Sequence, residues 1–334
     1  MERSLVFLVG PEDTSPATDS AGSEASTTNG PAPTTGAAST APPLTSTTEA
    51  ASSGPSDETT DDPTAGATET GDVDLDSGCP QPLPENWVLC EDFEGIADLA
   101  SHFAVVDGGG MAIGGPGYES SDALEITHFA QQNWVGELLI RFGQGPEANN
   151  ITEPDGHFEE VWVRARFRSD RGWPIRGPGD LLSVDGVDGP GWASTFKARI
   201  SAGQSEPAIR NSAFTCVFGD QHLCDGTDDW SSLSYLGGEA GLVSVFDESV
   251  VQDWHCAVVH ARLNAAGNSD GLLEVLVDGQ PDAAVTGLNF RGSQSSLGFN
   301  LISLPTYMET ALQNDHRRYI DDVVVSTQSL DCEP

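Results

Sequence analysis

Basic side chains are concentrated on one short segment of this acidic chain, and their spacing suits anion binding. Arg164, Arg166 and Arg168 alternate with apolar residues in the segment 160–168. Alternate side chains of a β-strand point to opposite faces, so the three guanidinium groups share one face of a predicted strand with Trp162. Arginine binds planar carboxylates and sulfates through paired hydrogen bonds, and an exposed tryptophan can stack on a sugar ring.

Two further predicted strands, 192–200 and 254–263, repeat this alternation. The basic residues on their polar faces are Lys197, Arg199, His260 and Arg262. In the strand 254–263 the alternative is that Cys256 and Val258 define the core side. If the three strands belong to one sheet, these side chains form a cationic groove, and its natural ligand is an acidic polysaccharide. The alternative is that the arginines pair with acidic side chains of neighbouring strands.

The same residues suggest an elimination reaction on uronic acids. Such a reaction needs a group that neutralises the carboxylate, a base that removes the adjacent proton and an acid that protonates the leaving oxygen. The arginines suit the first task, and His260, Tyr307 and His316 are the candidates for proton transfer. Tyr307 and His316 belong to the loop 305–317 before the last predicted strand, and loops often carry function. These residues form no recognisable catalytic motif, so binding without catalysis stays the first hypothesis.

Composition excludes several other functions. The formal net charge of the 334-residue chain is −38, which repels nucleic acids and anionic lipid surfaces. The sequence has no apolar run long enough to span a membrane. It also has no P-loop, no dinucleotide-binding glycine motif and no common zinc motif. Oligomeric state is left undetermined.

From residue 79 onward the chain is a succession of short alternating segments separated by Gly, Asp, Asn and Pro. Many short strands with turn residues between them predict a sandwich or barrel. Val277, Asp278 and Gly279 predict a tight turn at the end of one strand. We therefore expect one all-β domain over 79–334, built as a two-sheet antiparallel jelly-roll sandwich.

All six cysteines lie in this domain, which indicates disulfides and an oxidising compartment. Cys216 and Cys224 are the first expected pair because they close a short loop. The natural remainder is Cys79 with Cys90 and Cys256 with Cys332. The alternative is that the cysteines are buried free thiols.

The first 78 residues differ in composition from the rest. Residues 11–78 are rich in Thr, Ser, Ala, Pro and Gly, carry many acidic residues and contain no aromatic side chain. Such a segment buries too little apolar surface to fold, so it predicts a disordered acidic linker. Residues 1–10 resemble the remnant of an export signal, although no cleavage site follows. These features, with the cysteines, predict a secreted or cell-surface protein.

Five segments together resemble the concanavalin A-like lectin and glucanase jelly rolls. In chain order they are Leu89–Gly95 (LCEDFEG), Ser121–Ile126 (SDALEI), Val161–Arg164 (VWVR), Leu276–Gly279 (LVDG) and Arg318–Ser326 (RYIDDVVVS). Within that superfamily they are nearest to secreted polysaccharide-lyase-like and carbohydrate-binding domains. The glucanase branch uses a Glu-x-Asp-x-Glu strand, which this sequence lacks, so glycoside hydrolysis is disfavoured.

The resemblance also implies a structural calcium ion that ties the first strand to the last. The ligands it implies are Glu94, Ser121, Asp122, Asp321 and Asp322. Calcium prefers six to eight hard oxygen ligands, and carboxylates with loop carbonyls supply them. The alternative is that Asp321 and Asp322 are polar positions of an edge strand.

Three functions follow as hypotheses. The first is a lectin-like domain that binds an acidic polysaccharide. The second is a polysaccharide lyase that cleaves a uronic-acid glycan by β-elimination. The third is a structural or adhesion domain without a sugar site. A base and an acid beside the basic residues would distinguish the second from the first.

Overall fold

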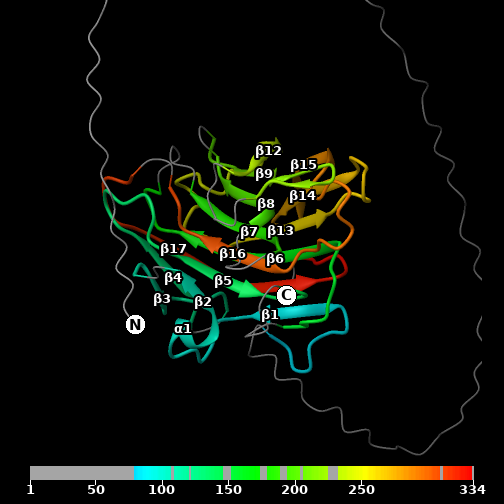
Figure 1. The fold of residues 1–334 in the computed structure, drawn as a ribbon. Helices are drawn as coiled ribbons and strands as arrows, with labels where there is room; N and C mark the ends of the chain where they lie inside the picture. The colour runs from blue at the N-terminus through cyan, green and yellow to red at the C-terminus, as the bar shows by residue number, and fades with distance from the viewer. Residues whose placement is uncertain are drawn as a thin grey trace, which may run out of the picture. The chain divides into compact units, whose positions relative to one another are not determined.

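The computed structural model describes residues 79–106, 109–119, 122–145, 152–173, 179–188, 194–203, 206–224, 232–308 and 311–332. The predicted linker, the predicted export signal and Ser121 lie outside these ranges. The described chain is built almost wholly of antiparallel strands, which form two large sheets (Figure 1). The predicted all-β, two-sheet sandwich is therefore confirmed.

The first sheet has the strand order β15-β14-β13-β6-β17-β4-β3, and β1 also pairs with β17. Its strands are β1 (Trp87–Glu91), β3 (Met111–Ile113), β4 (Leu124–His128), β6 (Glu160–Ser169), β13 (His255–Arg262), β14 (Gly271–Val277), β15 (Gln280–Leu288) and β17 (His316–Ser326). The first and last of these strands therefore lie side by side (Figure 1).

The second sheet has the order β12-β9-β8-β7-β16-β5-β2. Its strands are β2 (Ala104–Val106), β5 (Glu137–Arg141), β7 (Asp180–Val187), β8 (Ser194–Ala202), β9 (Ile209–Thr215), β12 (Ser234–Gly237) and β16 (Leu301–Pro305). A small hairpin pairs β10 (Val217–Phe218) with β11 (Gln221–His222), and the short helix α1 (Leu99–His102) precedes β2. No helix in the described ranges is long and apolar enough to cross a membrane.

The core lies between the sheets because each strand presents alternate apolar side chains to the other sheet. Val163 and Phe167 of β6 are fully buried in this core, as are Phe196 and Ile200 of β8. Packing is tight enough that a Cβ atom at Gly186 would overlap the ring of Phe196. The faces predicted for β6 and β8 are therefore correct, and their basic residues lie on the outer faces.

Strand β17 contains a bulge that affects its acidic pair. Between Asp321 and Val324 the strand has one residue more than the facing segment of β6. Asp322 is the extra residue, and its φ angle is 48°. The bulge restores the alternation after it, so that Val323 and Val325 enter the core. Two consecutive aspartates are thereby accommodated within a buried strand.

The six cysteines pair as the chain order favours. The structure contains the disulfides Cys79–Cys90, Cys216–Cys224 and Cys256–Cys332. The third has the longest sequence separation, 76 residues, and joins the start of β13 to the segment after β17.

Candidate functional site

The structure does not bring the three basic strands together. Strands β6 and β13 are neighbours in the first sheet, whereas β8 lies in the second sheet. The basic residues predicted for one groove are thus divided between opposite outer faces of the sandwich. Sheet membership depends on long-range pairing, which the alternation within one strand does not encode.

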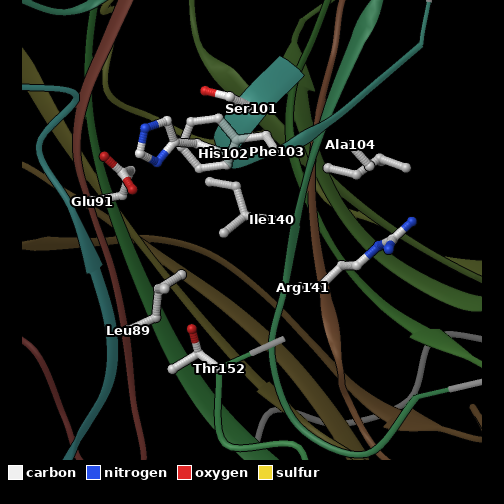
Figure 2. Close-up of a pocket in the computed structure, with 10 residues that line it drawn as sticks. Leu89, Glu91, Ser101, His102, Phe103, Ala104, Ile140, Arg141 and Thr152 are labelled. Atoms are coloured by element: carbon white, nitrogen blue, oxygen red, sulfur yellow. The ribbon is translucent and has the colours of Figure 1, made fainter. Parts of the chain in front are cut away.

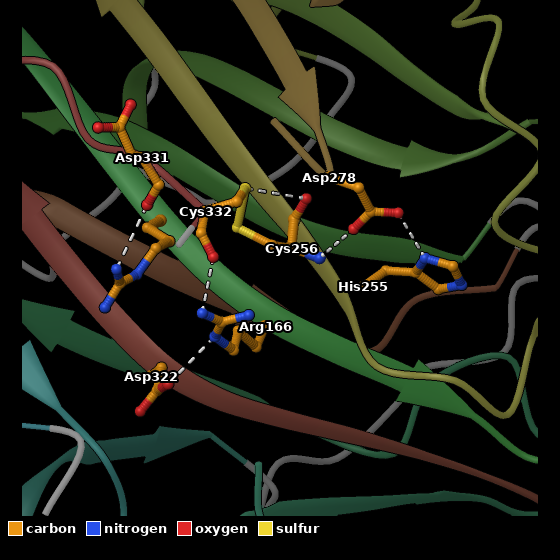
Figure 3. Close-up of a disulfide and its surroundings, with 8 residues drawn as sticks. Arg166, His255, Cys256, Asp278, Asp322, Asp331 and Cys332 are labelled. Carbon is orange, nitrogen blue, oxygen red and sulfur yellow. Dashed lines mark hydrogen bonds and ion pairs between the residues drawn. A yellow bond between two sulfur atoms is a disulfide. The ribbon is translucent and has the colours of Figure 1, made fainter. Parts of the chain in front are cut away.

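On the first sheet, the segment after β17 covers the arginines of β6. Arg164 and Arg166 are only 6% and 5% exposed. Arg166 donates from Nη2 to the backbone oxygen of Cys332 at 2.8 Å, and its Nε lies 3.2 Å from Asp322 Oδ2 (Figure 3). Arg164 donates from Nη1 to the backbone oxygen of Asp331 at 3.3 Å. These contacts leave little guanidinium surface for a polysaccharide.

Aromatic rings occupy the other sides of these arginines. The guanidinium carbons of Arg164 and Arg166 lie over the rings of Trp87 and Tyr118, at 5.5 and 3.7 Å from the ring centres. Arg168 lies over Tyr319 at 4.8 Å. Cation–π contacts of this kind stabilise a packed face. The expected alternative, pairing with an acidic side chain of a neighbouring strand, describes Arg166 with Asp322, whereas Arg164 binds a backbone oxygen.

Trp162 and His260 form a stacked pair on the same face. Their rings are 4.1 Å apart and nearly parallel. His260 Nε2 lies 2.8 Å from Glu160 Oε1, and Nδ1 lies 3.4 Å from Glu274 Oε2. With carboxylates at both ring nitrogens, His260 is held as a partner of glutamates. Arg262, further along β13, is exposed and donates to the backbone oxygen of Asp270.

The outer face of the second sheet carries a row of polar side chains that crosses four strands. Strand register places these residues directly opposite one another in the order Ser303 (β16), Ser183 (β7), Arg199 (β8), Ser212 (β9). We call this set the polar row. The three serines are buried, and Arg199 is 18% exposed. Sequence reasoning found only Arg199, because single serines in a strand carry no distinctive signal.

A second row runs beside the polar row. Lys197 of β8 lies opposite Asp185 on one side and Phe214 on the other, and Phe214 lies opposite Tyr235. Lys197 Nζ is 3.3 Å from Asp185 Oδ2, and both side chains are buried. The centres of the Phe214 and Tyr235 rings are 5.5 Å apart with the rings tilted, and Tyr235 is 54% exposed. The row therefore runs from a buried ion pair to an exposed aromatic edge.

Arg199 forms a hydrogen-bonded ion pair with Asp180. Its Nη1 donates to Asp180 Oδ1 at 2.7 Å, and its Cζ lies 5.2 Å from the centre of the Phe214 ring. Asp180 also donates from its backbone N–H to the carbonyl oxygen of Tyr307 at 3.1 Å. Tyr307, which is 41% exposed, therefore lies at the same end of the second sheet as Arg199.

The other proton-transfer candidates are elsewhere. His316 begins β17 in the first sheet and lies edge-on to Trp173, at 6.2 Å between ring centres. His260 is on β13 of the same sheet. Of the three candidates, only Tyr307 lies beside a predicted basic residue of the second sheet.

The residues implied as calcium ligands are partly brought together. Glu94 Oε1 accepts a hydrogen bond from the backbone N–H of Asp122 at 2.8 Å. Asp321 Oδ2 accepts one from Tyr118 N–H at 2.7 Å, so both carboxylates hold the segment that precedes β4. Asp322 is instead the partner of Arg166. Glu94, Asp122 and Asp321 retain the hard oxygen chemistry that calcium prefers, and the ion stays a prediction.

A cavity of about 330 Å³ lies between the edges of the two sheets, beside α1. Glu91, His102 and Arg141 line it, and Figure 2 shows the Glu91 carboxylate beside the His102 ring. Burial raises the pKa of Glu91 to about 7, with a smaller contribution from the charge of Asp92 and opposition from the Phe93 N–H. The carboxyl group therefore changes charge near neutral pH.

Comparison with known proteins supplies the fold. No protein-family model and no curated protein matches the sequence. The alginate lyase vAL-1 from a Chlorella virus is 13% identical, with a TM-score of 0.51, over 73% of this chain and 100% of that one. A PL-14 alginate lyase from Aplysia kurodai is 14% identical, with a TM-score of 0.50, over 72% of this chain and 99% of that one. The chain therefore has the jelly-roll fold of these polysaccharide lyases.

Proposed function

We propose that this protein is a polysaccharide lyase that cleaves a uronic-acid glycan by β-elimination on the outer face of the second sheet. The observation that carries the proposal is the polar row, in which a partly exposed Arg199 lies between buried serine hydroxyls. This face combines a cation for the uronate with an aromatic edge for sugar stacking.

The proposed reaction has three parts. Arg199 binds the carboxylate of the sugar and stabilises the negative charge that develops there when the adjacent C–H proton is removed. The electron pair of that C–H bond then forms a C=C double bond as the glycosidic C–O bond breaks. An acid returns a proton to the leaving oxygen. The products are one saturated chain and one chain that ends in an unsaturated uronate.

Exposed tyrosines and the lysine supply the groups for proton transfer. Tyr307 lies at the Arg199 end of the sheet, and Tyr235 is at its aromatic edge. Lys197 is buried and pairs with Asp185, so it ranks behind the tyrosines. We assign Tyr307 as the first candidate for proton transfer, and Tyr235 as the second.

The fold neighbours indicate which substrate to test first. Both are alginate lyases, and alginate is composed of uronic acids. A secreted location agrees with the three disulfides. The second candidate function is a lectin-like domain, which the exposed Tyr235 beside Phe214 favours because an aromatic edge can bind a sugar ring without catalysis.

The test is an elimination assay on the full chain with alginate, polyglucuronate and polygalacturonate. Unsaturated uronate absorbs near about 235 nm, so absorbance reports the double bond directly. We expect absorbance to rise with one of these substrates. In Arg199→Met the rate of this rise should be at least about 100-fold lower. Arg317→Met, an exposed position of the first sheet, is the matched control and should keep full activity.

Two outcomes contradict the lyase. Binding of an acidic polysaccharide without a rise in absorbance would favour the lectin-like domain. Neither binding nor a rise in absorbance on all three substrates would remove both functions and leave a structural domain.

A further inference from the structure

Four buried polar side chains lie together inside the sandwich, away from the proposed site. Their members are His128, Ser169, Trp173 and Arg318, and we call them the Arg318 cluster. Arg318 is fully buried, and each of the other three is at most 3% exposed. Arg318 lies opposite Ser169 in the β17–β6 pairing, and its Cζ lies 4.4 Å from the centre of the Trp173 ring. The His128 ring lies edge-on to Trp173 at 5.3 Å.

One edge of the Arg318 guanidinium has no protein partner among the described residues. Nη1 donates to the backbone oxygen of Asp180 at 2.6 Å, whereas Nε and Nη2 make no hydrogen bond. Nε and Nη2 carry parallel N–H bonds on one side of the guanidinium. That edge is the one with which arginine binds an anion in a bidentate manner.

The neighbouring side chains also have polar atoms without a hydrogen-bond partner. Within the same described ranges, Ser169 Oγ, Trp173 Nε1 and His128 Nε2 are also buried without a hydrogen-bond partner. Native proteins rarely leave a buried polar group unsatisfied, and a cluster of them marks an ordered water or ion. The Trp173 indole N–H can only donate, and the Ser169 hydroxyl can donate. With the two N–H groups of Arg318, the cluster has more donors than acceptors.

The charge of the Arg318 cluster favours an anion over a water molecule as its occupant. The charge of the Asp180 carboxylate acts to raise the pKa of Arg318, but the same carboxylate is engaged by Arg199 Nη1 at 2.7 Å. Burial, with the charges of Arg318 and His316, lowers the pKa of His128 to about 3, so this ring is neutral. Burial lowers the pKa of Arg318 only to about 9, which leaves it charged at neutral pH. A buried cation that shares its carboxylate with a second arginine is therefore stabilised further by an anion of its own.

We propose that the Arg318 cluster binds a small monovalent anion of the halide class. The anion lies against the Nε and Nη2 edge of Arg318 and accepts hydrogen bonds from the Ser169 hydroxyl and the Trp173 indole. It supplies a second negative charge for Arg318, beside that of Asp180, whose carboxylate Arg199 already engages. Because Arg318 also holds the backbone of Asp180, the anion links β17 of the first sheet to β7 of the second.

The first experiment is diffraction from crystals of the protein in sodium bromide, with data collected at the bromine edge. We expect an anomalous peak within hydrogen-bonding distance of Arg318 Nε and Nη2. A water molecule at that position, with no anomalous signal, would overturn the proposal. This measurement needs no variant and does not depend on the proposed lyase activity.

The second experiment follows thermal unfolding of the full chain at constant ionic strength. Bromide or chloride in place of gluconate should raise Tm saturably, by about 3–6 °C. Arg318→Met should remove this rise. Arg317→Met changes the adjacent, half-exposed arginine and should keep it. A rise of equal size in both variants would show a general salt effect and contradict the site.

Discussion

Arg166 of β6 donates a hydrogen bond of 2.8 Å to the backbone oxygen of Cys332, so a buried arginine holds the segment that a disulfide fastens to β13. The cation, the carbonyl and the disulfide act on the same segment. Cys256 itself lies at the start of β13, opposite Arg166 in the β6 pairing. The outer face of the first sheet is thus closed by covalent and ionic contacts at one point.

Removal of this disulfide should be costly. The Cys256→Ser, Cys332→Ser double variant loses a link between residues 76 apart, and we expect the free energy of unfolding to fall by about 4 kcal/mol. Guanidinium chloride unfolding measures this change. The Cys79→Ser, Cys90→Ser variant is the control, and its shorter loop of 11 residues predicts about 3 kcal/mol. The loop-entropy account fails if the shorter link contributes more.

His255 should make stability depend on pH. Burial disfavours its charged form, but the hydrogen bond and the charge of Asp278 outweigh burial and raise the pKa of His255. The stabilisation is therefore complete below the ordinary value of 6.5 and is lost as pH rises through the raised value. His255→Gln should lower stability by about 1 kcal/mol at pH 5.5 and by little at pH 9, measured by urea unfolding.

The partner carboxylate sets the acid limit of this effect. The contacts of Asp278 with His255 and with the Cys256 N–H outweigh its burial and lower the pKa of Asp278. Its contribution is present above the ordinary value of 3.8 and is lost as pH falls through the lowered value. An unchanged pH profile in His255→Gln would show that the pair contributes nothing to stability.

The ionised form of Glu91 should destabilise the folded protein. Its pKa is raised to about 7 by burial, so the folded state holds a proton that the unfolded state has lost. Stability therefore falls as pH rises from about 4.5 to about 7. Glu91→Gln keeps the acceptor for the Phe93 N–H and should be more stable than the native chain at pH 8, by roughly 2–3 kcal/mol. Equal stability at pH 8 would contradict the buried charge.

Calcium is tested by its removal. If Glu94 and Asp321 hold an ion, a chelator should lower Tm by several degrees and calcium should restore it, as measured by calorimetry. The Glu94→Gln, Asp321→Asn double variant should lose the response to calcium. Asp98→Asn, at the N-cap of α1, is a control that should retain it. A native chain with the same Tm in chelator and in calcium would exclude a stabilising ion.

Proton transfer should depend on one of two tyrosines. Tyr307→Phe removes only a hydroxyl, and we expect kcat to fall by about 100-fold or more with little change in KM if Tyr307 transfers the proton. Tyr235→Phe serves as the comparison in the same assay. The opposite result, a large loss only in Tyr235→Phe, would move the reaction to the aromatic edge of the sheet.

The alternation of β6 and β8 predicted which side chains leave the core, because that pattern is local to each strand. It did not predict what covers Arg164 and Arg166, since Asp331 and Cys332 are more than 160 residues away in the chain. Sheet membership is equally non-local, and Lys197 and Arg199 belong to a different sheet from Arg164 for that reason.

The polar row illustrates a different limit. Ser183, Ser212 and Ser303 gain meaning only through the register of four strands, and serine is common at such positions. These serines could have been found by searching the neighbouring strands for small polar residues opposite Arg199. The disulfides were more tractable, because the order of the cysteines favours neighbours such as Cys216 and Cys224.

The bulge in β17 bears on how this gene can change in length. Asp322 is the extra residue, and without it Val323 would follow Asp321 directly in register with β6. A substitution at this position alters one contact with Arg166. A three-nucleotide deletion would remove the bulge and leave Val323 and Val325 facing the core, because Asp321 already faces Arg166 and Val324 already faces Arg164. The gene can therefore lose this codon without shifting the phase of the strand, and what it would lose is the second carboxylate.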